Sequence, residues 1–142
     1  MIDAVIQRLA SQISDLKKVE GAGAFAAIME ANAWPQQSPS AFVVPLSVRG
    51  GGVDAATNAY LQTVAETIAV VLILRPNDRL AARGIEPVEG LRDDVIQALA
   101  GWRPGDEVGV FEVSQARMLN VRSGRIAYQI QFTITDQLRI LS

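Results

Sequence analysis

The feature that most constrains the fold is an uninterrupted run of strand-forming residues at positions 61–75, LQTVAETIAVVLILR. Its first half alternates, with Val64, Glu66 and Ile68 on one side, whereas residues 68–74 are continuously apolar. Alternation is typical of a strand with one buried face, and a continuous apolar run is typical of a strand covered on both faces. Most of these side chains are β-branched and favour a pleated surface, so the run predicts a strand rather than a helix.

The predicted strand is unusually long. At roughly 3.3 Å per residue it would extend about 45 Å, beyond the usual length of strands in globular domains. Such a strand either bends between two sheets or leaves the domain as one arm of a hairpin. The preceding strand-like run, residues 42–48, contains Pro45, which indicates an edge strand or a bulge. The glycine-rich, polar residues 50–59 between the two runs predict a long antiparallel hairpin with a poorly ordered tip.

Three segments have helical patterns. Residues 2–13 repeat apolar side chains on one face, which predicts an amphipathic helix. A short strand within residues 15–20 and a turn at Gly21 precede a small-residue helix that reaches about Ala33. The third helix begins at Pro87 and ends before Gly101, with its apolar stripe formed by Val88, Leu91, Val95 and Leu99.

The last third of the chain is predicted to be β structure. Strands at residues 108–113 and 117–121 lead to a hairpin turn at residues 122–125. The return strand alternates, with Tyr128, Ile130, Phe132 and Ile134 directed inward. The sequence therefore predicts a single α+β domain over residues 1–142. We expect a mainly antiparallel or mixed sheet with two main helices packed on it and a long protruding hairpin, and we expect the helices to gather on one face of the sheet.

The composition excludes several kinds of chemistry. The chain has 142 residues without His or Cys, which removes imidazole and thiolate metal sites, Cys nucleophiles and Ser-His-Asp triads. A net charge of −2 gives no basic field for nucleic acid, and neither a secretory signal nor a membrane span is visible. A hydrophobic fraction of 49% indicates either an Ala- and Val-rich composition or a subunit that buries apolar surface against neighbours.

Two motifs could suggest ligand binding, and neither has the expected context. Gly21, Gly23 and Ala26 match the dinucleotide pattern G-x-G-x-x-A, but the preceding strand is short and charged, and no acidic residue follows near the ribose position. The acids Glu86, Glu89, Asp93 and Asp94 are more typical of a solvated helix start than of a metal or acid/base site. We therefore expect no catalytic, cofactor-binding or metal site.

Segments spread over most of the chain resemble the tail terminator proteins of long-tailed bacteriophages. They are the opening helix MIDAVI, the turn VEGA at residues 19–22, SAFVVP at residues 40–45, the strand at residues 62–74 with its centre TIAVV, and ALAGW at residues 98–102. The resemblance implies an α+β virion assembly protein that forms a ring, commonly a hexamer, on the end of the tail tube. It implies as partners further copies of the chain, the tail tube protein, a neck or head-completion protein and, where one is present, the tail sheath.

The resemblance also implies a place in the virion, at the tail or neck, after assembly in the host cytoplasm, without specific nucleic-acid or membrane binding. Two alternatives stay open at this stage, a different neck or head-completion ring protein and a small enzyme or ligand-binding domain that uses the acidic helix start or the turn at residues 21–26. The hairpin tip and the arginine-bearing loop after the long strand are our candidate interface segments. Their residues are Arg49, Gly50, Gly51, Gly52, Val53, Asp54, Arg75, Asn77, Asp78, Arg79 and Arg83.

Overall fold

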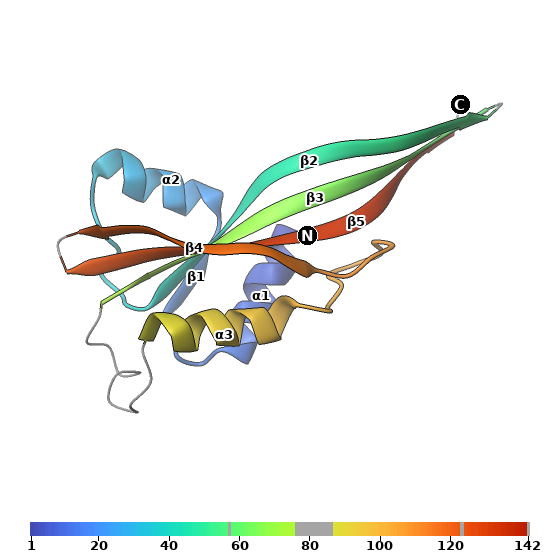
Figure 1. The fold of residues 1–142 in the computed structure, drawn as a ribbon. Coiled ribbons are helices and arrows are strands. Elements are labelled where there is room, and N and C mark those ends of the chain that lie inside the picture. The colour runs from blue at the N-terminus through green and yellow to red at the C-terminus, as the bar shows by residue number, and fades with distance from the viewer. Residues whose placement is uncertain (57, 76–86, 123, 142) are drawn as a thin grey trace.

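The computed structural model describes residues 1–56, 58–75, 87–122 and 124–141. The described residues form an α+β fold around one mixed five-stranded sheet with strand order β1-β2-β3-β5-β4 (Figure 1). The elements in chain order are α1 (Ile2–Gln12), β1 (Lys18–Glu20), α2 (Ala22–Ala31), β2 (Ser40–Ala56), β3 (Ala59–Leu74), α3 (Pro87–Leu99), β4 (Glu112–Arg122) and β5 (Arg125–Leu141).

The long central strand is confirmed. β3 lies in the middle of the sheet, antiparallel to β2 on one side and to β5 on the other. Its residues from Ile68 to Leu74 are all buried, as the continuous apolar run predicts. Pro45 lies at a register shift in β2, and β1 pairs with β2 only from Ser40 to Phe42, so the rest of β2 is an edge. Both predictions for this proline are therefore confirmed.

The expectation that the helices gather on one face of the sheet holds for the two longer helices, α1 and α3, and is wrong for α2. The larger core cluster joins α1 and α3 to one face through residues such as Leu9, Leu91, Val70 and Phe132. A smaller cluster joins α2 to the opposite face, where Phe25 and Ile28 of α2 pack near Phe42, Val71, Ile73 and Ala127. Figure 1 shows α2 on one side of the sheet and α1 and α3 on the other. Odd and even residues of β3 point to opposite faces of the sheet, and both sets are apolar, so both faces need a layer of helices. We call these surfaces the α1 face and the α2 face.

Local sequence signals explain the helix boundaries. Pro87 is the first residue of α3, where its missing N–H is not needed. Gly101 follows this helix with φ +79°, and Asn32 closes α2 with φ 52°, the left-handed conformation typical of helix ends. The predicted buried stripe of α3 is confirmed, since Leu91, Val95 and Leu99 are fully buried.

The prediction of two strands at residues 108–113 and 117–121 is only partly right. β4 is one strand that begins at Glu112, and the backbone before Phe111 is irregular. The Gly109 N–H donates to the Thr135 carbonyl oxygen, and a Cβ at Gly109 would lie 3.0 Å from the same oxygen. A close approach of this kind favours glycine and ends the regular pairing. The hairpin turn is confirmed, with Gly124 at φ +72° between β4 and β5.

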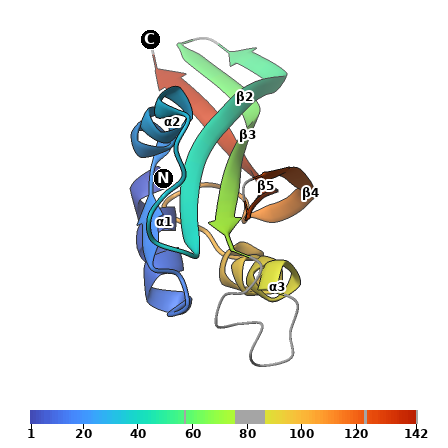
Figure 2. The same ribbon diagram turned by 90° about the vertical axis from the view of Figure 1, so that its left-hand side faces the viewer.

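The expectation of a poorly ordered connection at residues 50–59 is also wrong for residues 50–56, 58 and 59, and Thr57 lies outside the described residues. β2 continues to Ala56 and pairs with β3 up to the partners Ala56 and Ala59. β5 runs beside β3 to the same level, where Ala59 faces Leu141. The expected two-stranded protruding hairpin is therefore not confirmed in that form, because the outer parts of β2, β3 and β5 make a three-stranded extension beyond the helices (Figure 1). A view turned by 90° shows how strongly these strands twist (Figure 2).

Candidate functional site

The three-stranded extension is the first candidate surface, and we call it the ribbon. It comprises residues 47–56 of β2, 59–67 of β3 and 133–141 of β5. Directly paired residues of antiparallel strands share a face, so the register assigns every side chain to one face or the other. The ribbon continues both faces of the sheet beyond the part that the helices cover.

The ribbon side that continues the α1 face is apolar and open. Val48 is 65% exposed, Val53 54%, Leu138 41% and Ile140 53%. Across the register, Ile140 pairs with the half-buried Tyr60, Val53 and Leu138 both pair with Gln62, and Val48 pairs with Glu66. The charged residues on this side are two acids, Glu66 and Asp136, and no basic residue shares it. The free subunit thus exposes several apolar side chains on this side, with Gln62 and the two acids among them.

The opposite side of the ribbon, which continues the α2 face, is mainly polar. It presents threonines such as Thr63, Thr67 and Thr133, and the last two approach each other with 3.1 Å between their Oγ1 atoms. Its basic residues are Arg49 and Arg139. The ribbon is therefore amphipathic, and only one of its two broad sides resembles a protein interface core.

The predicted hairpin-tip residues divide between these two sides. Gly50 and Val53 pair with residues of the apolar side, whereas Arg49 and Asp54 pair with residues of the polar side. A bulge separates Gly50 from Val53, and a Cβ at Gly51 would lie 3.0 Å from the Thr63 carbonyl oxygen. A Cβ at Gly52 would meet nothing within 4 Å, so the glycine run is needed for close strand approach at only part of its length.

The second predicted segment lies mostly outside the described residues. Arg75 follows the end of β3, and its backbone N–H donates to Ser38 Oγ at 3.1 Å. Asn77, Asp78, Arg79 and Arg83 belong to residues that the structure does not describe. Arg75 and the hairpin tip lie at opposite ends of β3, so Arg75 does not share a site with the tip residues.

A second candidate surface, absent from the sequence analysis, lies on the α2 face between α2 and β4. It is an apolar groove of about 130 Å³ lined by Phe25, Met29, Trp34, Val71, Ile73, Leu119, Asn120 and Ala127. Met29 is 48% exposed and Leu119 40% exposed, so the rim of the groove is open. Within α2 no residue is fully buried, although Glu30 is its only charged side chain. The apolar composition of α2 is the part of this observation that can be read from the sequence.

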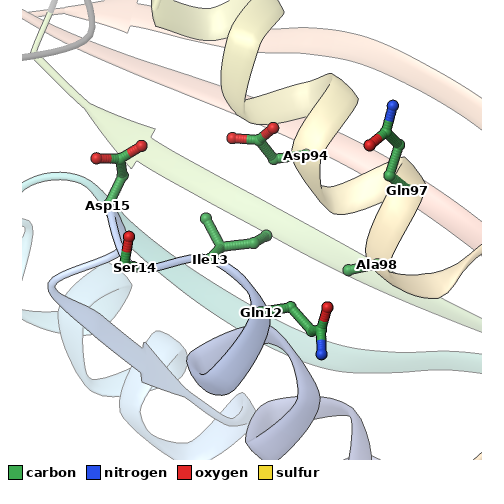
Figure 3. A pocket seen from close by; sticks show the side chains of 7 residues that line it. All are labelled: Gln12, Ile13, Ser14, Asp15, Asp94, Gln97 and Ala98. Carbon is green, nitrogen blue, oxygen red and sulfur yellow. The ribbon is translucent and has the colours of Figure 1, made fainter.

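A third hollow, of about 270 Å³, lies where the end of α1 meets α3 (Figure 3). Asp15 stands on one side of it and Asp94 on the other, with Gln12 and Gln97 nearer its far end (Figure 3). No group of three or more metal-ligating side chains occurs among the residues that the structure describes. Two carboxylates alone give neither the ligand count of a metal site nor an acid/base pair with assigned roles.

The other acids of α3 interact with a neighbouring arginine. Arg92 contacts Asp93 at 3.0 Å and Glu89 at 3.7 Å, and its hydrogen bonds, first to Asp93 and then to Tyr128, raise the pKa of Arg92 above its usual value. This guanidinium therefore stays charged at every accessible pH. Glu86 lies outside the described residues. In the described part of the chain, no helix is long and apolar enough to span a membrane.

Comparison with known proteins gives the family. A chain from a solved structure titled "Virion of native gene transfer agent (GTA) particle" shares the fold, with a TM-score of 0.60, 12% sequence identity, and coverage of 97% of this chain and 95% of that chain. No curated protein matches this sequence. The family model described as phage tail terminator protein matches residues 2–141. Because the match spans nearly the whole chain, this protein belongs to the phage tail terminator family and is a structural component of a phage tail.

Proposed function

We propose that the protein assembles into a homo-oligomeric ring, a hexamer, on the end of the phage tail tube. The ring stops tube polymerisation and presents the surface to which the neck or head-completion protein binds. Its direct partners are further copies of the chain, the tube protein and the neck protein. Assembly takes place in the host cytoplasm, and the ring remains in the virion at the junction between tail and head.

The apolar side of the ribbon is the observation that supports this proposal most strongly. Val48, Val53 and Ile140 on this side are each more than half exposed. Contiguous apolar surface on a free subunit marks an interaction site. A ring needs a heterologous contact, in which one surface of each subunit meets a different surface of the next. A ribbon that extends beyond the helices is suited to reach such a neighbour.

The proposed role does not involve catalysis. Asp94 faces a hollow whose opposite wall carries one further carboxylate, Asp15, and Asp93 is already engaged by Arg92. We expect Ala substitutions of Glu89, Asp93 and Asp94 to leave virion yield unchanged. Saturable micromolar binding of Mg²⁺ or of a nucleotide, abolished by one of these changes, would instead favour a ligand-binding domain.

The proposed function is tested by the tails of a phage that lacks this chain. We expect overlong tails of variable length that carry no head, and wild-type protein supplied in trans should restore a single tail length. The purified protein should also reach the mass of a ring, in solution or on isolated tubes. Tails of normal length that simply fail to join heads would assign the chain to another neck ring and contradict tube termination.

A further inference from the structure

We propose that, in the ring, the apolar side of the ribbon lies in the groove between α2 and β4 of the next copy of this chain. This inference rests on the proposed function, because it names the two surfaces through which the ring closes. The donor is the side of the ribbon that carries Val53 and Ile140. The acceptor is the groove whose open rim carries Met29 and Leu119.

The positions of the two surfaces exclude a contact within one subunit. The donor continues the α1 face at one end of the sheet, and the acceptor is on the α2 face at the other end (Figure 1). β5 contributes to both, and at roughly 3.3 Å per residue Ala127 in the groove is about 43 Å along the strand from Ile140 in the ribbon. Surfaces on opposite faces and opposite ends are suited to head-to-tail association, which closes into a ring when the rotation between copies allows it.

The charges around the two surfaces are complementary. The donor side carries the acids Glu66 and Asp136 and no base. The acceptor is flanked on its own face of the β4–β5 hairpin by Arg117 and Arg125. Neither arginine forms an ion pair among the described residues, and the buried Nε of Arg125 has no hydrogen-bond partner there. An arriving carboxylate would give these guanidinium groups the partner that they prefer.

The size of the donor also favours a copy of the chain over a small ligand. Three strands about 4.8 Å apart and about 30 Å long give a planar footprint of roughly 400 Å². A stable interface buries about 800 Å² on each partner, so the ribbon supplies roughly half of one side. The other half of the buried area would come from the residues around the groove. A small molecule, by contrast, would leave most of the ribbon exposed.

Disulfide crosslinking tests the contact directly, because the chain has no cysteine. The variants are Met29→Cys at the groove rim and Ile140→Cys on the apolar side, with Thr63→Cys on the polar side of the ribbon as the matched control. All three positions are exposed, and circular dichroism checks that each variant folds. Rings assembled on tubes from an equal mixture of two variants are oxidised and separated without reductant.

We expect a linked dimer from the M29C and I140C mixture, and a ladder of linked oligomers from the double variant. The M29C and T63C mixture should stay at least tenfold less linked. Self-linking of I140C alone at the same rate would show a two-fold ribbon-to-ribbon contact and overturn the proposal. Intact rings without the M29C–I140C link would also overturn it while leaving the ring function in place. If the double variant gives a ladder but phage without this chain make tails of normal length, the contact between copies stands and the proposed function is wrong.

Discussion

Shortening Ile140 should weaken assembly far more than shortening its neighbour Leu141. The two residues are adjacent in β5 but lie on opposite sides of the ribbon, Ile140 on the apolar side and Leu141 on the polar side. Ile140→Ala removes three carbon groups worth about 0.8 kcal/mol each when they are buried. Because Ile140 is 53% exposed in the free subunit, burying it in a contact gains only about half of this transfer free energy, roughly 1.2 kcal/mol, and Ile140→Ala loses that gain. Each subunit contact should therefore weaken about eightfold.

The assay is mass photometry of purified protein over a dilution series, in solution or on isolated tubes. Leu141→Ala is the control, because it removes a similar apolar volume from a side chain that is 76% exposed on the other side. We expect its dissociation midpoint to equal that of the wild type within about twofold. Urea unfolding of both variants measures the loss of subunit stability, about 1 kcal/mol or less. Equal effects of the two substitutions on assembly would refute the assignment of the apolar side as the contact.

The remaining predictions concern the subunit itself. Gly51→Ala should lower the free energy of unfolding by about 1 kcal/mol, because its Cβ would lie 3.0 Å from a backbone carbonyl oxygen of β3, whereas Gly52→Ala meets nothing and should be neutral. Urea midpoints compare the two, and equal values would contradict the close approach. Arg8→Ala should cost about 2 kcal/mol, since Nε donates to a carbonyl oxygen of α3 at 2.7 Å and the guanidinium carbon lies 4.7 Å from the Trp102 ring centroid. Arg8→Lys keeps the positive charge but not the planar guanidinium, so it should restore less than half of the free energy of unfolding that Arg8→Ala loses. Full restoration would mean that the charge alone stabilises this contact.

The sheet could be predicted from the sequence where periodicity is strong. The alternation in residues 61–68 and the continuous apolar run to Leu74 defined β3 and its double cover. The same reasoning should have excluded helices on a single face, because Val71 and Ile73 are buried on the side opposite Val70 and Leu72. Apolar residues at both odd and even positions of a strand thus indicated helices on both faces of the sheet, which the helix sequences alone did not.

The ribbon could be predicted only in part. The alternation of β5 continues past Thr135 through Asp136, Leu138 and Ile140, and following it would have revealed the third strand. Glycine-rich composition instead indicated a mobile tip. Composition cannot show that Val53 and its neighbours pair with β3, because that pairing depends on a bulge that restores the register. For the groove, the apolar composition of α2 was the only indication in the sequence, because residues of α2 and β4 come to line one groove only in the folded chain.

Tube growth in the presence of the purified protein tests whether this chain stops tube polymerisation. Purified tube protein is allowed to polymerise with and without this chain, and tube lengths are measured by electron microscopy over time. We expect one ring at one end of each capped tube and lengths that stop increasing once the rings are bound, with I140A requiring a higher concentration for the same arrest. Tubes that keep elongating at the control rate, with or without rings attached, would contradict this expectation.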